Sequence, residues 1–123
     1  MNSGQQTLLS HHSYELKKSA SGECFTLAGD LDAEGAARVL EAMEAQVLST
    51  ELTSLDLEDL ELLDGAAVAR MVDFVRHLLS VSRRVEVIKS PQSLAHTLYR
   101  VGMLEGDSRL ELIEPREEEG TTN

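Results

Sequence analysis

The side chains that could do chemistry in this 123-residue sequence do not combine into a catalytic set. Its four histidines include no pair at the HxxH or HxxxH spacing of metal ligands. The single Cys24 stands in an apolar run without a basic neighbour, which predicts a buried, unreactive thiol. The sequence contains no GxxxxGK[ST] or GxGxxG phosphate-binding motif. We therefore expect no enzymatic activity, no metal site and no cofactor.

The most distinctive stretch is ELLDGAAV at positions 61–68, where an acidic residue ends an apolar run and three small residues follow. A helix N-terminus has unpaired amides and a partial positive charge, which the Asp64 carboxylate can cap. Gly65, Ala66 and Ala67 keep the surface low, so that another protein can approach closely. The alternative is structural: Asp64 is only a cap, and the small residues only permit tight packing of helix on strand.

Charge narrows the kinds of partner. The formal net charge of −11 argues against direct binding to nucleic acid or anionic membranes, which are polyanions. Residues 23–64 hold twelve acids against one base, whereas residues 65–104 hold two acids against six bases. This separation predicts either a polarised surface that orients a protein partner or simply an acidic and a basic face on one domain. Asp30 and Asp32 are candidate contacts for a basic partner, and Arg70 is a candidate interface residue beside residues 64–67.

The apolar pattern predicts an α/β fold. The expected elements, in order, are strands at 12–18 and 24–28, a helix at 33–48, a strand at 52–57, a helix at 66–81, a strand at 85–88, a helix at 92–101 and a strand at 110–113. This order favours a mixed sheet of four to five strands, with about three helices packed mainly on one face. We expect Asp32 to cap the first helix and Gly102 to end the third. Residues 29–32 are predicted to be a loop and residues 58–63 a connector.

The ends of the chain are expected to lie outside this domain. Residues 1–11 are polar and predict a flexible lead, and residues 114–123 (EPREEEGTTN) predict a disordered acidic tail. Residues 12–113 form the predicted domain. The N-terminal residues lack the pattern of a secretory signal, no apolar stretch is long enough to cross a bilayer, and the lone cysteine suits a reducing compartment. We therefore expect a cytoplasmic protein.

Four segments in this order resemble the STAS family, the bacterial anti-sigma-factor antagonists. They are LAGDLD at 27–32, LDLEDLELLDGAAV at 55–68, VEVIKSP at 85–91 and LYRVGML at 98–104. The resemblance covers residues 12–113 and implies a STAS-like fold. In the family, the junction commonly reads Asp-Ser-Ser/Thr-Gly, and a partner kinase phosphorylates a hydroxyl there. Ala66 aligns with the usual phosphoacceptor and has no oxygen, so the resemblance implies the docking geometry without the phosphorylation switch.

The chain also resembles the STAS subunit of bacterial lipid-transporting ABC systems, in its size and in the segment PQSLAHTLYRVGM at 91–103. There a Thr is usual near the junction, so Gly65 and Ala66 depart from that pattern too. The resemblance implies a non-catalytic regulatory or adaptor domain that binds a cytoplasmic protein. The expected partner is the ATPase of a transport system or a GHKL-type anti-sigma kinase. The alternative is a self-associating scaffold or assembly protein that uses its acidic and basic faces.

Overall fold

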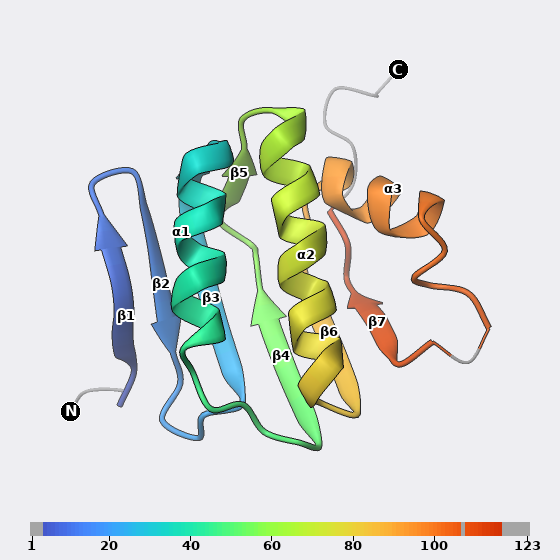
Figure 1. Cartoon of the computed structure of the whole chain (residues 1–123), viewed down its shortest axis with the longest axis horizontal. Coiled ribbons are helices and arrows are strands. Elements are labelled where there is room, and N and C mark those ends of the chain that lie inside the picture. Colours follow the sequence, from blue (N-terminus) through green and yellow to red (C-terminus); the bar gives the residue numbers. More distant parts are fainter. Residues whose placement is uncertain (1–3, 107, 117–123) are drawn as a thin grey trace.

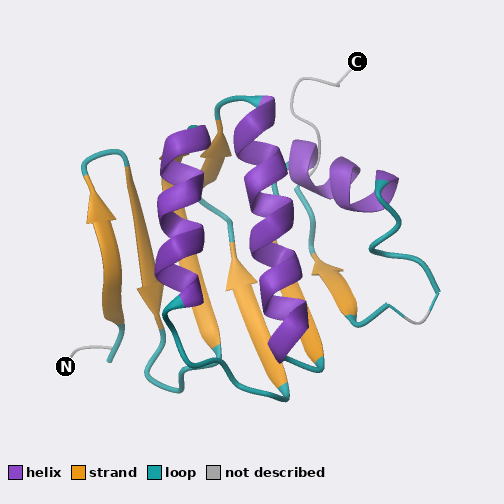
Figure 2. Cartoon of the chain, in the orientation of Figure 1, coloured by secondary structure: helices purple, strands orange, loops and turns teal. Residues whose placement is uncertain are grey.

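Alternating strands and helices build a mixed α/β fold in the computed structural model, which describes residues 4–106 and 108–116 (Figures 1 and 2). The elements are β1 (Gln6–His11), β2 (Tyr14–Lys18), β3 (Cys24–Leu31), α1 (Ala33–Glu44), β4 (Leu52–Asp56), β5 (Leu60–Leu62), α2 (Gly65–Val81), β6 (Arg84–Ile88), α3 (Gln92–Arg100) and β7 (Leu110–Ile113). The α/β class and the three helices confirm the prediction.

The sheet is mixed, with the order β1-β2-β3-β4-β6-β7 and β5 paired to β3. The β1, β2 and β3 strands are antiparallel neighbours, whereas β3, β4, β6 and β7 run parallel. Parallel neighbours need crossover connections, and α1, α2 and α3 supply them. The carboxyl ends of the parallel strands therefore lie at one end of the sheet, where each following helix begins.

Among the described residues the sheet has seven strands, more than the four to five that we predicted. The β1 strand occupies residues 6–11, within the predicted lead, because Gln6, Ser10 and His11 pair with residues of β2. The β5 strand occupies part of the predicted connector. The β1 strand is largely polar and β5 has only three residues. Neither shows a clear alternation of apolar and polar residues in the sequence. Residues 1–3 of the predicted lead and residues 117–123 of the predicted tail lie outside the described residues.

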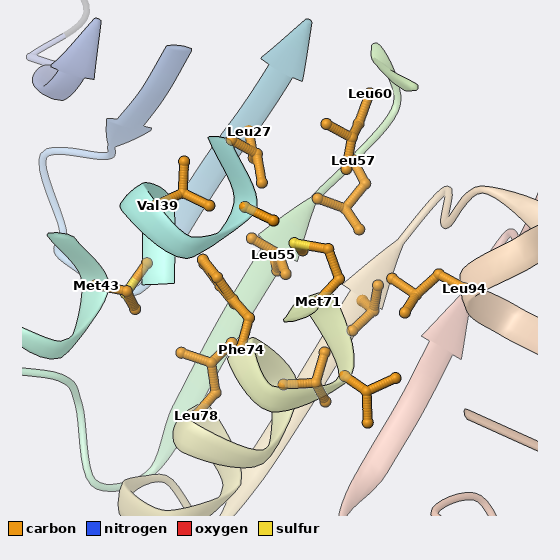
Figure 3. Packing of buried hydrophobic residues seen from close by; sticks show 14 of the residues in the cluster. Leu27, Val39, Met43, Leu55, Leu57, Leu60, Met71, Phe74, Leu78 and Leu94 are labelled. Atoms are coloured by element: carbon orange, nitrogen blue, oxygen red, sulfur yellow. The ribbon is translucent and has the colours of Figure 1, made fainter. Parts of the chain in front are cut away.

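The core lies between the sheet and the helices, because α1 and α2 cover the same face of the sheet and α3 packs beside α2 (Figure 1). It is almost wholly aliphatic, as the scarcity of aromatic residues requires. Phe74 of α2 is fully buried and lies close to Leu55 of β4 and Leu78 of α2 (Figure 3). The helices thus stay on the sheet by burying Leu, Val and Met side chains, each worth roughly 1.5–3 kcal/mol when fully buried.

The β5 strand continues β4 along β3 with one extra residue. Thr26 of β3 pairs with Asp56 at the end of β4, and Gly29 pairs with Leu60 at the start of β5. Gly29 thus lies three residues after Thr26 in β3, whereas Leu60 lies four residues after Asp56 in the adjacent segment. One extra residue on one side of a strand pair defines a β-bulge. Gly29 has a φ of +111° and donates its N–H to the Asp59 carbonyl at 2.9 Å. The glycine is required here, since a Cβ would lie 2.2 Å from the Ser13 carbonyl oxygen.

Replacing Gly29 with alanine should destabilise the fold by at least about 2 kcal/mol, because the side chain meets backbone at a positive φ. Gly65 offers a matched control, since a Cβ there meets no atom within 4 Å. Gly65→Ala should be neutral or stabilising by up to about 0.5 kcal/mol, because alanine loses less backbone entropy on folding. Urea unfolding followed by circular dichroism measures both; equal midpoints for the two variants would contradict the role of Gly29.

Candidate functional site

The first turns of α1 and α2 lie side by side at one end of the sheet. The α1 helix follows β3 and α2 follows β5, and β3 and β5 are parallel, so both helices start at the same end (Figure 1). The N–H of Leu63 donates to the Leu31 carbonyl at 3.0 Å, just before each helix begins. The predicted acids of positions 30 and 32 are thereby brought next to the junction at 64–67.

Both helices are capped by an aspartate in the same way. The Asp32 carboxylate accepts from the Gly35 N–H, and the Asp64 carboxylate accepts from the Ala67 N–H, each at 2.8 Å. Both caps were predicted and both are confirmed. Each carboxylate satisfies an amide that the helix leaves unpaired and adds negative charge at its positive end. The hydrogen bonds hold these two carboxylates, and so their negative charges, in fixed positions at one end of the sheet.

The junction presents a low, exposed and hydroxyl-free surface. Asp64, Gly65, Ala66 and Arg70 are exposed, and Arg70 lies one helical turn after Ala66. Ala67 is fully buried, since the first turn of α2 directs it into the core. Ala67 therefore supports this surface from below and does not form part of it. We call the exposed set Leu63, Asp64, Gly65, Ala66 and Arg70 the junction surface.

Asp30 lies within β3, not in a loop as we predicted, because β5 pairs with the end of that strand and extends it to Leu31. Asp30 and Asp32 line a pocket of about 310 Å³ together with Leu63 of the junction surface. The other lining residues are His11, Ser13, Tyr14, Glu34, Gly35 and Arg38. This acidic pocket therefore adjoins the junction surface on its α1 side.

Arg38 is the single arginine or lysine of the acidic pocket and is held by its neighbours. Its guanidinium donates to the Glu34 carboxylate at 2.9 Å. The Tyr14 hydroxyl, followed by the Glu34 carboxylate, raises the pKa of Arg38 above its ordinary value. Because Arg38 is already engaged, Asp30 and the free oxygen of Asp32 leave the pocket with an unbalanced negative charge.

A second hollow adjoins the junction surface on its α3 side, and we call it the α2–α3 groove. It holds about 400 Å³ and is lined by Gly65, Val68, Ala69, Ser93, His96, Thr97 and Arg100. Most of its exposed lining surface is apolar, and Arg100 gives it a positive charge. Sequence reasoning missed the groove and also Leu63, whose side chain is 59% exposed. The only signal available was that His96 and Arg100, four residues apart, share one face of α3.

Cys24 is half-buried on the face of the sheet opposite α1 and α2, so it is less buried than we predicted. Burial raises the pKa of its thiol, and the carboxylates of Asp56 and Glu86 raise it further. A raised pKa disfavours the thiolate, which fits the predicted lack of reactivity. Within residues 4–106 and 108–116, no three His, Cys, Asp or Glu side chains cluster as they would to hold a metal ion.

The sequence of the chain matches a model of a known protein family. A family model described as "Mlab, STAS domain" matches residues 16–113, about four-fifths of the chain. The chain belongs to the STAS family. STAS domains are generally non-catalytic modules that bind and regulate other proteins, as in anti-sigma-factor antagonists. No curated protein matches the chain. None of the helices in the described part of the chain is long and apolar enough to span a membrane.

Removing either aspartate cap should destabilise the protein modestly. We expect Asp64→Ala and Asp32→Ala each to lower the free energy of unfolding by about 0.5–2 kcal/mol, because each leaves a helix amide unpaired. Glu44→Ala, at the exposed end of α1, is the control and should change it by less than about 0.5 kcal/mol. Urea unfolding measures all three, and a Glu44 effect as large as the others would refute the capping account.

Proposed function

We propose that this chain is a STAS adaptor that binds one cytoplasmic protein through the junction surface, without a phosphorylation switch. The observation that carries the proposal is the exposed Gly65 and Ala66 at the start of α2, next to the Asp64 cap. A partner can approach the backbone there closely, because a Cβ added at Gly65 meets no atom within 4 Å. Ala66 offers no hydroxyl that a kinase could phosphorylate.

The surroundings of the junction surface support a protein as the ligand. The acidic pocket flanks it toward α1, and the α2–α3 groove with His96 and Arg100 flanks it toward α3. A partner that places basic groups against Asp30 and Asp32 and an apolar or acidic segment in the groove would be held in one orientation. Electrostatic complementarity of this kind gives specificity and faster association more than affinity alone.

The partner that we favour is the ATPase of a bacterial transport system, on the resemblance of residues 91–103 to a transporter-associated STAS subunit. A GHKL-type anti-sigma kinase is the other candidate. In ordinary family members a phosphate would add a charge of about −1.5 to −2 to this contact. With alanine at position 66, phosphorylation at this position could not control binding to either partner.

Ala66→Arg should weaken binding of a co-expressed transport ATPase by at least about 2 kcal/mol, or about 30-fold in Kd, because it buries an unpaired charge in the contact. Ala66→Ser is the matched control, because it is small and should bind like the wild type. Isothermal titration calorimetry with purified proteins measures both variants. Unchanged affinity for Ala66→Arg would refute docking at the junction surface.

Phosphate incorporation into the wild-type chain by a cognate kinase would show that the switch lies at another hydroxyl.

The alternative function is a self-associating scaffold in which the acidic pocket of one copy meets the basic groove of another. The separation of charge between the two hollows favours it. Such contacts weaken as salt rises, because ions screen exposed charges beyond about 10 Å at 0.1 M. Light scattering at low and high salt should give a monomer mass throughout if the adaptor proposal holds. A mass that rises at low salt and falls at high salt would favour the scaffold.

A further inference from the structure

Arg116 makes more hydrogen bonds than its place in the sequence suggests. It lies within residues 114–123, which we predicted to be a disordered tail, yet its side chain is only 25% exposed. Its Nε donates to the Lys89 carbonyl at 3.1 Å, and its Nη2 donates to the carbonyls of Leu57 and Leu60, both at 2.5 Å. Its Nη1 reaches the Glu61 carboxylate at 3.3 Å, and its own N–H donates to the Ser90 carbonyl at 3.3 Å.

These bonds close a gap that the fold leaves in the sheet. The β4 strand pairs with β6 only as far as Asp56 and Ile88. Beyond that point the bulge carries the chain away from β6 and into β5, whose pairing lies with β3. The carbonyls of Leu57, Leu60 and Lys89 converge where a neighbouring strand would otherwise donate to them, and that of Leu57 also accepts from the Leu60 N–H at 3.1 Å. Buried carbonyls need such donors, and a guanidinium offers five in a fixed fork.

The β5 strand depends on this support because it has only three residues and a single strand partner, β3. It leads directly to Leu63 and Asp64, the first two residues of the junction surface. The hydrogen bonds of the Arg116 guanidinium hold the backbone carbonyls of Leu57 and Leu60 in place. The same guanidinium also contacts the carboxylate of Glu61, which lies between Leu60 and the junction surface. A displacement of β5 would therefore move the Asp64 cap and Leu63 together.

We infer that Arg116 is a positioning residue for the junction surface. Its guanidinium holds β5 against the end of β6 and thereby sets where α2 begins. This inference rests on the proposed function for its biological meaning, since the junction surface is the proposed docking site. The positioning itself can be tested on the free protein, without any partner.

The test compares Arg116→Gln with Arg109→Gln by amide hydrogen exchange in NMR spectra of the full chain. Arg109 is a matched control, because its guanidinium also donates to backbone carbonyls, those of Ser82 at 2.8 Å and Arg83 at 3.5 Å, after the end of α2. In Arg116→Gln, the amides of Leu60 and Leu63 should exchange at least tenfold faster than in the wild type. Those of Val85 and Val87 in β6 should change by less than twofold.

Arg109→Gln should leave the Leu60 and Leu63 amides within twofold of the wild type. Arg116→Lys, which keeps the charge and loses the fork, should give intermediate rates and so separate geometry from charge. The inference is overturned if Arg116→Gln leaves the Leu60 and Leu63 amides within twofold. It is also overturned if that variant accelerates the β6 amides by the same factor, which would mean that Arg116 stabilises the whole fold and positions nothing in particular.

If Arg116→Gln does not fold, the Arg116→Lys comparison and the Nε–H of Arg116 in the wild type still decide the matter. That proton should exchange at least tenfold more slowly than in free arginine, and an equal rate would overturn the inference. The outcome is independent of the proposed function. Unchanged docking of Ala66→Arg would refute the docking site and leave the exchange result standing, whereas unaffected Leu60 and Leu63 amides would refute the positioning and leave the docking site standing.

Discussion

The arrangement of this protein depends on how β3 divides its pairing between two neighbours. Its first residues pair with β4 and its last three pair with β5, with one extra residue inserted between. This bulge lets β3 run on to Leu31, so that α1 and α2 begin beside each other. Had β4 and β5 been one regular strand, every side chain beyond the insertion would point to the opposite face. Leu57 and Leu60 are three residues apart, so a regular strand would point them to opposite faces; both are fully buried because the insertion returns Leu60 to the core side.

The two helix starts that meet at this end share one capping chemistry and differ in what surrounds them. The α1 side gathers Asp30, Asp32 and Glu34, and the α3 side gathers His96 and Arg100. Between them, the exposed start of α2 carries no charge at Gly65 or Ala66. Opposite charges on the two sides of the junction surface would favour one orientation of a bound protein, because a rotated partner would bring like charges together. Ala66 has no hydroxyl, and this electrostatic pattern does not depend on one.

Much of the fold could be predicted from the sequence. The helical spacing of apolar residues located all three helices, and the sequence features Asp32, Asp64 and Gly102 marked helix ends that the structure confirms. What could not be predicted depends on long-range pairing. Residues 6–11 and 60–62 become strands only because β2 and β3 accept them, and their own sequences are too polar or too short to indicate it. The contacts of Arg116 join residues more than 50 positions apart, which no local pattern encodes.

The sequence indicated where the candidate site lies along the chain, but not which residues are exposed there. The acidic residue and small residues at the junction were visible in the sequence, whereas the burial of Ala67 and the exposure of Leu63 depend on how α2 packs against the sheet. The two hollows combine residues from separate elements and could not be assembled without coordinates. Residue type therefore indicated the start of α2 as a candidate site, and tertiary packing determined which of its residues are exposed.

Gly65 stands in open space at the start of a helix whose opposite side is locked into the core. A Cβ added there meets no atom within 4 Å, so the packing of the fold does not require glycine at this position. A small side chain added at Gly65 would therefore change the shape of the exposed surface at the start of α2 without disturbing the packing of the helix on the sheet.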